Sequence, residues 1–542
     1  MRRDNGIVWT AAVCVAVCLG CLAASADVVT GIVFHDKNGN GILDKREKGI
    51  RDVLVSNGRD VAVTDKHGRY TLPIEDDMVV FVLKPSGWTT PVCPELHIPL
   101  FHYVHKPAGS PPMKYAGVAP TGPLPKSVNF PLRPQKERKR FRIVCLGDTQ
   151  PRNQQEVDYL SHAIVAELEG IDAAFGVTLG DVVFDDLSVF EPMARSIARI
   201  GLPWRHVPGN HDLNQDAPDL RYTADSFIRV FGPPYYAFAY GPVHFIVLNN
   251  IHWHIGEGGY HAELGADQLK FVENYLRHVP KNRLVVLFMH IPITEIRDRK
   301  QLFDLLENRP HTFSLSGHTH DQRHVFLGEP HGWRGARPHH HLVHATACGS
   351  WWSGNFDELS IPLSPMADGA PKGYSLIYFD DNRYQVIFKA AGRPAGHQMS
   401  IYAPDPVPAQ TTEFADVIVN VFAGSERSRV EMRVGESGAW TLMQPFRAED
   451  PHYLKIYGRQ TAFVEKIVAL KDIEEVNDAA LRQIQAEFMA IFGRGMTRPK
   501  ESAHLWKAPL PAGLRPGYHT LHVRTTDMFG AQHAASRVIR VE

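Results

Sequence analysis

Residues 141–150 read FRIVCLGDTQ. A mostly apolar run, Phe141 to Leu146, stops at Gly147 and is followed by Asp148 and Gln150. A short apolar run that ends at glycine and polar side chains is typical of a buried strand that ends in a turn. Ligands bind beyond the carboxyl ends of the strands in α/β sheets. The stretch therefore predicts a central strand with a functional site at its end.

Four more apolar runs along the chain end in the same way. They are Ala173 to Leu179 before Gly180-Asp181, Trp204 to Pro208 before Gly209-Asn210-His211-Asp212, Leu284 to Met289 before His290, and Thr312 to Ser316 before Gly317-His318-Thr319-His320. Helical periodicity separates them in 154–169, 188–200 and 265–278, which predicts an α/β fold. Any one of these polar residues alone would be an ordinary core or loop residue. Five strand ends in series favour a centre for two divalent metal ions.

This ordered series, GD-x-Q, GD, GNHD, His and GHTH, resembles that of the calcineurin-like metallophosphoesterases over about Phe141 to Ala391. The resemblance implies an α/β/β/α sandwich of two mixed sheets with helices outside. The segments 349–354 and 368–374 are similar to those of bacterial exported members that carry β domains at both ends.

The resemblance also implies roles for individual residues. The first metal would be held by Asp148, Gln150, Asp181 and His320, and the second by Asp181, Asn210, His290 and His318. His211 would be the catalytic imidazole. Asp212 follows directly and would either orient that imidazole or hold the turn.

Gln150 departs from the family pattern, which usually has histidine at this position. An amide oxygen is a harder ligand than imidazole, so the change favours Mn²⁺ or Mg²⁺ over Zn²⁺. Branches similar to the Mn-dependent ADP-ribose/CDP-alcohol diphosphatases also have glutamine here. We therefore expect Mn²⁺, with Fe, Zn and Mg open.

The expected reaction is hydrolysis of a phosphate ester. Two cations about 3.5–4 Å apart lower the pKa of a bridging water and clamp the phosphoryl oxygens, and His211 would assist the leaving group. The substrate, a phosphorylated small molecule or a cell-envelope phosphoester, is either a diester or diphosphate or a monoester. The alternative is a non-catalytic surface protein that binds a glycan or polymer and uses the central domain as a scaffold.

Aromatic residues near these motifs suggest where a substrate would lie. Trp351, Trp352 and Tyr374 are expected either to line the pocket or to pack their loop. A second wall would come from His252, Trp253, His254 and Tyr260. The run 339–341 is three histidines and is expected to be a solvated loop.

The rest of the chain is organised around this central part. The chain has 542 residues with a formal net charge of −1, which predicts several domains and gives no nucleic-acid-binding signature. We expect a β-sandwich module at 27–134, a solvated basic linker at 135–140, the α/β domain at 141–392, and a β-sandwich-like domain at 393–542. A helical stretch is expected at 478–492.

A second metal motif lies in the first module. Residues 36–47 match the loop pattern D-x-[DN]-x-[DN]-G-x5-E. Its Ca²⁺ ligands would be Asp36, Asn38, Asn40, the Ile42 carbonyl, Asp44 and Glu47. A turn without metal is the alternative.

The N-terminus indicates export. Arg2 and Arg3 precede an apolar run that ends at Ala24-Ser25-Ala26, a pattern typical of a secretory signal peptide over 1–26. Lipidation at Cys21 and an uncleaved anchor are the alternatives. No later stretch is apolar enough to span a bilayer. We expect a periplasmic or extracellular protein, and the sequence does not indicate its oligomeric state.

Overall fold

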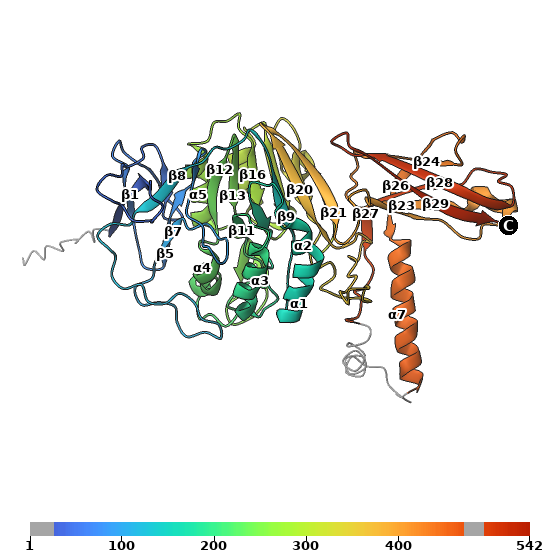
Figure 1. Cartoon of the computed structure of the whole chain (residues 1–542), viewed down its shortest axis with the longest axis horizontal. Coiled ribbons are helices and arrows are strands. Elements are labelled where there is room, and N and C mark those ends of the chain that lie inside the picture. Colours follow the sequence, from blue (N-terminus) through green and yellow to red (C-terminus); the bar gives the residue numbers. More distant parts are fainter. Residues whose placement is uncertain (1–26, 471–492) are drawn as a thin grey trace, which may run out of the picture.

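The computed structural model describes residues 27–470 and 493–542. A β module, a central α/β domain and a second β module follow one another along the long axis (Figure 1). The predicted α/β class with flanking β modules is confirmed. The predicted signal peptide and the helical stretch 478–492 lie outside the described residues.

Two mixed sheets form the centre. The first has the order β11-β10-β9-β20-β21, and the second has the order β12-β13-β16-β17-β19-β18. The strands of the first are β11 (Trp204–His206), β10 (Gly176–Thr178), β9 (Arg140–Leu146), β20 (Gly373–Asp380) and β21 (Arg383–Ala390). Those of the second are β12 (Tyr236–Tyr240), β13 (Val243–Val247), β16 (Val285–Phe288), β17 (Thr312–Ser316), β19 (His339–Val343) and β18 (Arg323–Leu327).

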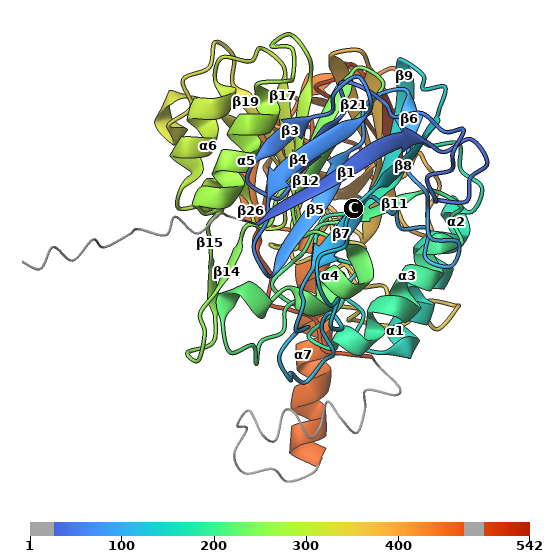
Figure 2. The same ribbon diagram turned by 90° about the vertical axis from the view of Figure 1, so that its left-hand side faces the viewer.

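Successive side chains of β9 face two different cores. Ile143 and Cys145 pack between the sheets, whereas Val144 and Leu146 pack under the outer helices. This alternation follows from the two-residue period of a strand, and burial on both faces explains the apolar run in the sequence. Helices cover the outer face of each sheet (Figure 2). They are α1 (Gln154–Leu160), α2 (Ala166–Leu168), α3 (Phe190–Ala198) and α4 (Asp225–Phe231) on one side, and α5 (Ala266–Leu276) and α6 (Arg299–Leu306) on the other.

Parallel pairing gathers the strand ends at one edge. The strands β9, β10 and β11 are parallel, and so are β13, β16, β17 and β19. Within each sheet, the loops that carry the predicted ligands therefore leave at one edge.

The first module is a sandwich of two four-stranded sheets, β4-β1-β8-β6 and β3-β2-β5-β7. Its strands are β1 (Val28–His35), β2 (Leu54–Ser56), β3 (Val61–Val63), β4 (Arg69–Pro73), β5 (Met78–Leu83), β6 (Trp88–Thr89), β7 (His102–His105) and β8 (Phe130–Pro134). It shares a core with the central domain, since Phe81 packs edge-on against Phe271 with ring centroids 5.7 Å apart.

The expectation that 135–140 is merely a solvated linker is wrong for Glu137. Its carboxylate accepts a bond from Lys84 Nζ at 2.6 Å and others from the backbone N–H groups of Gly87 and Gly241. The side chains of Lys84 and Glu137 are only 7% and 3% exposed. A buried and fully bonded ion pair thus ties the first module to the central domain.

The last module is also a two-sheet sandwich, β22-β23-β27-β26 and β25-β24-β28-β29. Its strands are β22 (Met399–Tyr402), β23 (Asp416–Val421), β24 (Arg429–Val434), β25 (Thr441–Leu442), β26 (Gln444–Glu449), β27 (Glu501–Pro509), β28 (Gly517–Thr526) and β29 (Gln532–Val541). A long helix that the sequence did not predict, α7 (Pro451–Leu470), leaves this module and projects away from the body (Figure 1).

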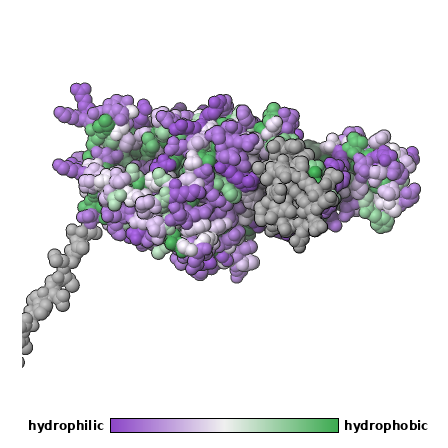
Figure 3. Space-filling view, turned by 90° about the horizontal axis from the view of Figure 1, so that it is seen from below, coloured by the Kyte–Doolittle hydropathy of each residue, from purple (hydrophilic) through white to green (hydrophobic). Residues whose placement is uncertain are grey.

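A membrane span requires a helix of sufficient length and hydrophobicity. Among the described residues, no helix is both long and apolar enough to cross a bilayer. The face drawn in Figure 3 is mainly hydrophilic, with hydrophobic residues scattered over it.

Candidate metal centre

Asp181 is the middle of the site. It follows β10, is 2% exposed, and receives bonds from Gln150 Nε2 at 2.8 Å and from the backbone N–H of His211 at 3.0 Å. His290 Nε2 lies 3.2 Å from Asp181 Oδ1. Three strand-end loops therefore converge on this one carboxylate.

Asp148 and the GHTH loop form one side of the site. The backbone N–H of His318 donates to both carboxylate oxygens of Asp148, at 3.0 and 3.1 Å. His320 donates its Nδ1 proton to the Gly349 carbonyl at 2.6 Å, which leaves the Nε2 lone pair 3.7 Å from Asp148 Oδ1. Among the described residues this buried Nε2 has no hydrogen-bond partner. A buried, unpartnered imidazole nitrogen beside a carboxylate fits a metal ligand.

His290 and Asn210 form the other side. His290 Nδ1 donates to the Leu179 carbonyl at 2.9 Å, which turns its Nε2 towards Asn210 Oδ1 at 3.1 Å and His318 Nδ1 at 3.2 Å. A backbone acceptor that fixes the tautomer in this way is usual for a ligating histidine. The structure thus brings all seven predicted ligands into one connected cluster: Asp148, Gln150, Asp181, Asn210, His290, His318 and His320.

The backbone around these ligands is strained. Five of them have positive φ, namely Asp148 (30°), Gln150 (45°), Asp181 (45°), His318 (76°) and His320 (52°). Each such non-glycine residue costs on the order of 1–3 kcal/mol and persists only where its surroundings hold it. The neighbouring glycines make this close packing feasible, because a methyl group on Gly317 would overlap Asp148 Oδ2. Strain of this kind collects at functional sites.

Burial sets the charges of the cluster. It raises the pKa of Asp148 to about 8 and lowers the pKa of His318 to about 3 and of His320 to about 4. Burial also opposes ionisation of Asp181, but His290 and His211 outweigh it and hold the Asp181 pKa below its ordinary value. His318 and His320 are thus neutral imidazoles beside the Asp181 carboxylate. Burial opposes the charge of His290, but Asp181 outweighs it and raises the His290 pKa to about 9, so a bound divalent ion would displace the His290 proton. With that exchange the side chains are the mixed imidazole and carboxylate set that a divalent transition ion requires.

His211 lies at the open rim of the cluster. Its side chain is 24% exposed, its Nε2 is 4.0 Å from Asp181 Oδ2, and its ring stacks on Phe184 at 4.3 Å. Its Nδ1 is 2.8 Å from Asp185 Oδ1. A carboxylate at Nδ1 fixes the ring and leaves Nε2 facing the site.

Asp185, rather than Asp212, is therefore the residue that orients His211. Asp212 is fully buried and accepts bonds from the backbone N–H groups of Val182, Val183 and Gly209 at 2.8–3.0 Å. Of the two roles expected for Asp212, the structure shows the one in the turn. The sequence analysis did not identify Asp185, since it lies in a loop outside the motifs.

The expected pocket residues separate into different environments. Trp351 stacks on His320 with centroids 4.1 Å apart and lies at the site. Trp352 is 1% exposed and donates its Nε1 proton to the Thr149 carbonyl, so it packs the loop from beneath. Tyr374 lies in the core under the outer helices, where its hydroxyl bonds Glu167. The expectation that Tyr374 lines the pocket is not supported by this position.

The second expected wall is a hairpin of β14 (Ile251–Trp253) and β15 (Tyr260–Ala262). Tyr260 reaches the site, since its ring lies edge-on to His318 at 5.8 Å. Trp253 is buried, at 9% exposure. His252 and His254 lie on the other face of this hairpin.

The expectation of a solvated loop at 339–341 is wrong. These three histidines open β19 and are at most 4% exposed. Ser314 Oγ on the neighbouring strand bonds His339 Nε2 and His341 Nδ1, each at 2.7 Å. Hydroxyl partners on β17 thus satisfy two of the buried rings, and His340 bonds the Tyr384 hydroxyl at 2.8 Å and His324 at 2.9 Å instead.

The last module contacts two loops of the site. Lys500 Nζ donates to the Thr319 carbonyl within the GHTH loop at 3.1 Å, and Thr497 Oγ1 bonds Ser350 Oγ at 3.2 Å. A buried network lies behind them, in which Asp368 Oδ2 accepts from Gln322 N at 2.9 Å and lies 3.0 Å from His504 Nε2. These contacts give the module a direct influence on how the loops are placed.

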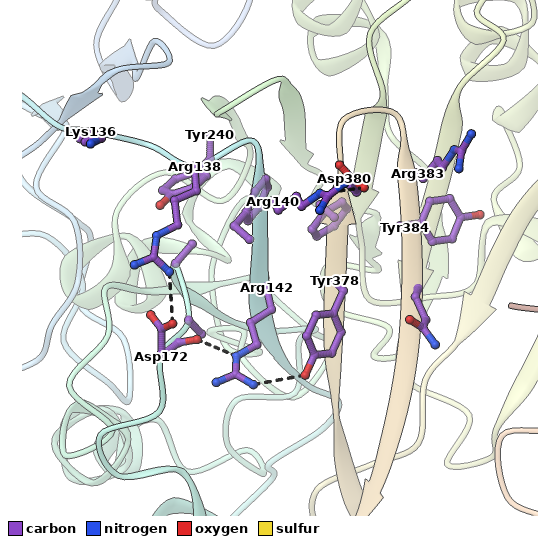
Figure 4. A pocket seen from close by; sticks show the side chains of 15 residues that line it. Lys136, Arg138, Arg140, Arg142, Asp172, Tyr240, Tyr378, Asp380, Arg383 and Tyr384 are labelled. Atoms are coloured by element: carbon purple, nitrogen blue, oxygen red, sulfur yellow. Dashed lines mark hydrogen bonds and ion pairs between the residues drawn. The ribbon is translucent and has the colours of Figure 1, made fainter. Parts of the chain in front are cut away.

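A large hollow of about 800 Å³ lies away from the cluster (Figure 4). One of its lining residues, Arg140, begins β9, whereas Asp148 lies just beyond the other end of that strand. The hollow and the metal-ligand cluster are therefore at opposite ends of β9. Its arginines have partners, for example Arg138 with Asp172 at 3.3 Å and Arg142 with the Tyr378 hydroxyl at 3.2 Å. Size alone therefore does not make this hollow the reaction site.

The predicted calcium loop is a closed ring of polar contacts. Asp36, which is 1% exposed, accepts from the backbone N–H of Gly39 at 2.7 Å and of Gly41 at 3.0 Å. Asp44 Oδ2 accepts from the side-chain amides of Asn38 and Asn40 at 2.8 and 3.1 Å. The carboxylates of the motif thus accept bonds from N–H groups of the same loop, and occupancy by Ca²⁺ stays a prediction.

Three family models match the chain in succession. They are the N terminal of calcineurin-like phosphoesterase at residues 37–115, calcineurin-like phosphoesterase at 141–322, and the C terminal of calcineurin-like phosphoesterase at 341–481. The chain belongs to the calcineurin-like phosphoesterase family and carries the N- and C-terminal modules of that family. It is accordingly a metal-dependent hydrolase of phosphate esters.

Other comparisons add little detail. No curated protein matches the chain. Among solved structures, the chain is similar to purple acid phosphatase PPD1 from yellow lupin (Lupinus luteus) seeds, with 11% sequence identity over 67% of each chain and a TM-score of 0.33.

Proposed function

We propose that this protein is an exported binuclear phosphoesterase that uses Mn²⁺ and hydrolyses a diester or diphosphate in preference to a monoester. The observation that carries the proposal is the convergence of six other ligand side chains around Asp181, with the buried Nε2 of His320 left without a partner among the described residues. Gln150 favours Mn²⁺ because its amide offers a hard oxygen.

The roles of the side chains follow from their positions. When bound, the two cations would supply Lewis acidity and an activated water. Asp181, between both ligand groups, would be the shared ligand. His211 would present Nε2 to the leaving oxygen, while Asp185 holds Nδ1 at 2.8 Å. Trp351, stacked on His320, would form part of the wall that the substrate contacts.

The proposal of export rests on the signal peptide predicted at 1–26. An exported enzyme would meet its substrate outside the cytoplasm, as a cell-envelope phosphoester or a phosphorylated small molecule.

A direct test compares two chromogenic esters. The purified protein, stripped of metal and reloaded with Mn²⁺, is expected to hydrolyse bis(p-nitrophenyl) phosphate faster than p-nitrophenyl phosphate. Asp181→Asn is expected to reduce both rates by roughly 10³-fold, since it removes the shared charge that holds the ions. A preference for the monoester would overturn the diesterase assignment. No turnover with both metals shown to be bound would favour the binding role.

We also propose that the loop 36–47 holds Ca²⁺ as a structural ion. Ca²⁺ is expected to raise the melting temperature of the protein by several degrees, because an ion that binds only the folded state stabilises it. The shift is measured by calorimetry with Ca²⁺ and with a chelator, and Asp36→Asn should abolish it. An equal shift in that variant would show that Ca²⁺ acts elsewhere.

A further inference from the structure

The hairpin of β14 and β15 lies at the edge of the molecule in Figure 2. One of its faces carries a second group of side chains of the types that ligate metals. Residues His252 and His261 are direct partners across the two strands. Side chains two positions apart in a strand share a face, so His254 and Glu263 extend the same row. We call His252, His254, His261 and Glu263 the hairpin cluster.

The two faces of the hairpin are different. Ile251, Trp253 and Ala262 are buried against the body, and Tyr260 on this inner face reaches His318. The hairpin cluster faces outward and stays accessible, with side-chain exposures of 39% for His252, 14% for His261 and 37% for Glu263. It is therefore separate from the seven ligands around Asp181.

The distances within the cluster suit one small cation. One ligand atom from each of His252, His261 and Glu263 lies within 4.8 Å of the other two. His261 Nε2 is 2.8 Å and His252 Nδ1 is 3.9 Å from Glu263 Oε2. Two ligand atoms bound to a tetrahedral Zn²⁺ are roughly 3.4 Å apart, given bonds of about 2.0–2.1 Å. The observed distances lie on either side of that value, so small rotations of the side chains suffice.

The remaining histidine has the position of an outer partner. His254 Nε2 lies 2.7 Å from His261 Nδ1. The bond at Nδ1 holds the ring so that Nε2 faces Glu263. In the absence of metal, His261 Nε2 donates to Glu263 Oε2, and Nδ1 of the neutral ring accepts from His254. When Nε2 loses its proton to become a ligand, Nδ1 can become the donor to His254, and such an outer partner is usual for a ligating histidine. A bound cation would displace that proton to solvent.

We propose that His252, His261 and Glu263 form a mononuclear site for a transition metal of the Zn²⁺ class, with His254 as its outer partner and one coordination position open. Two imidazoles and one carboxylate favour Zn²⁺ over Ca²⁺ or Mg²⁺, which require mostly oxygen ligands. The ion would cross-link the two strands of the hairpin that brings Tyr260 to the dinuclear centre.

The test counts bound metal in the full chain. The stripped protein is dialysed against Zn²⁺, and its metal content is measured by mass spectrometry beside that of His261→Asn, Glu263→Gln and His278→Asn. His278 is exposed and lies outside the cluster, so its variant serves as the control. We expect the first two variants to hold one equivalent less than the parent and the control to hold the same amount. Equal content in all four proteins would overturn the site.

Three further measurements distinguish this site from the dinuclear centre and from a purely structural effect. In Asp181→Asn the hairpin equivalent should persist, so failure of the dinuclear proposal and failure of this one are distinguishable. Co²⁺ at a four-coordinate site gives a visible absorption band, and His261→Asn should lose the hairpin contribution to it. An unchanged spectrum would contradict the proposal. Glu263→Gln keeps the shape of the side chain, so a loss of metal without a change in the melting temperature of the stripped protein would assign the effect to coordination.

Discussion

His211→Ala is expected to lower kcat for the diester by roughly 10²–10⁴-fold while both metal ions stay bound, because general acid–base groups contribute about that factor. None of the contacts among the seven ligands passes through the His211 ring. Only its backbone N–H bonds Asp181, and alanine keeps that group. Metal content by mass spectrometry and kcat with saturating substrate are the two readouts.

The orienting carboxylate provides the graded control for this prediction. Asp185→Asn keeps the imidazole but weakens the contact at Nδ1, so its loss of kcat should be smaller than that of His211→Ala. Asp185→Asn should have no further effect in the His211→Ala background, since the two act as one unit. Full activity of His211→Ala would remove the imidazole from the mechanism, and loss of metal in it would make His211 a structural residue.

The ligands could be predicted from the sequence because each lies within a few residues of a strand that is recognisable as an apolar run. Asp148 and His290 each lie two residues past the end of their strand, β9 and β16, so an apolar run and its polar end suffice. Parallel pairing brings such ends together within each sheet. The packing of the two sheets on one another, which no local pattern shows, brings Asp148 and His290 together.

The residues that the sequence analysis missed or misplaced depend on contacts between distant segments. The histidines 339–341 are polar and were expected in solvent, but Ser314 on β17 bonds His339 and His341, and the Tyr384 hydroxyl bonds His340. Such pairing is invisible in a local pattern. Asp185 is near His211 only because the loops after β10 and β11 meet. Tyr374 was expected at the pocket because the segment 368–374 resembles that of family members, whereas the strand β20 carries it into the core.

The helix α7 was missed for a different reason. Its apolar side chains are not all buried, and Leu454 and Ile456 are 40% and 38% exposed. Helical periodicity in a sequence arises from a buried stripe, so a helix that projects from the body gives a weak signal. Its start is marked instead by Asp450, whose carboxylate accepts the Tyr453 N–H at 2.8 Å.

The second large loss of activity is expected for Gly317→Ala, a substitution in the GHTH loop. A methyl group at this position would overlap Asp148 Oδ2, and Asp148 cannot retreat without losing its two bonds from the His318 N–H. The first metal would lose a correctly placed ligand, and a displacement of about 1 Å can cost on the order of 10²-fold in rate. We expect the variant to hold about one metal ion fewer and to lose at least that factor in kcat.

Gly396→Ala is the matched control for this change. An added methyl there meets nothing within 4 Å, and its backbone lies outside the positive φ range, so it should keep both metal content and kcat.

Asp148→Asn provides a second comparison, since it keeps the shape of the side chain and removes its charge. If Gly317→Ala loses metal as Asp148→Asn does while its melting temperature matches that of the stripped parent, the glycine acts through the position of Asp148. Normal metal content and kcat in Gly317→Ala would mean that the loop relaxes around the methyl group, and the close packing of the GHTH loop on Asp148 would then not be required for the centre.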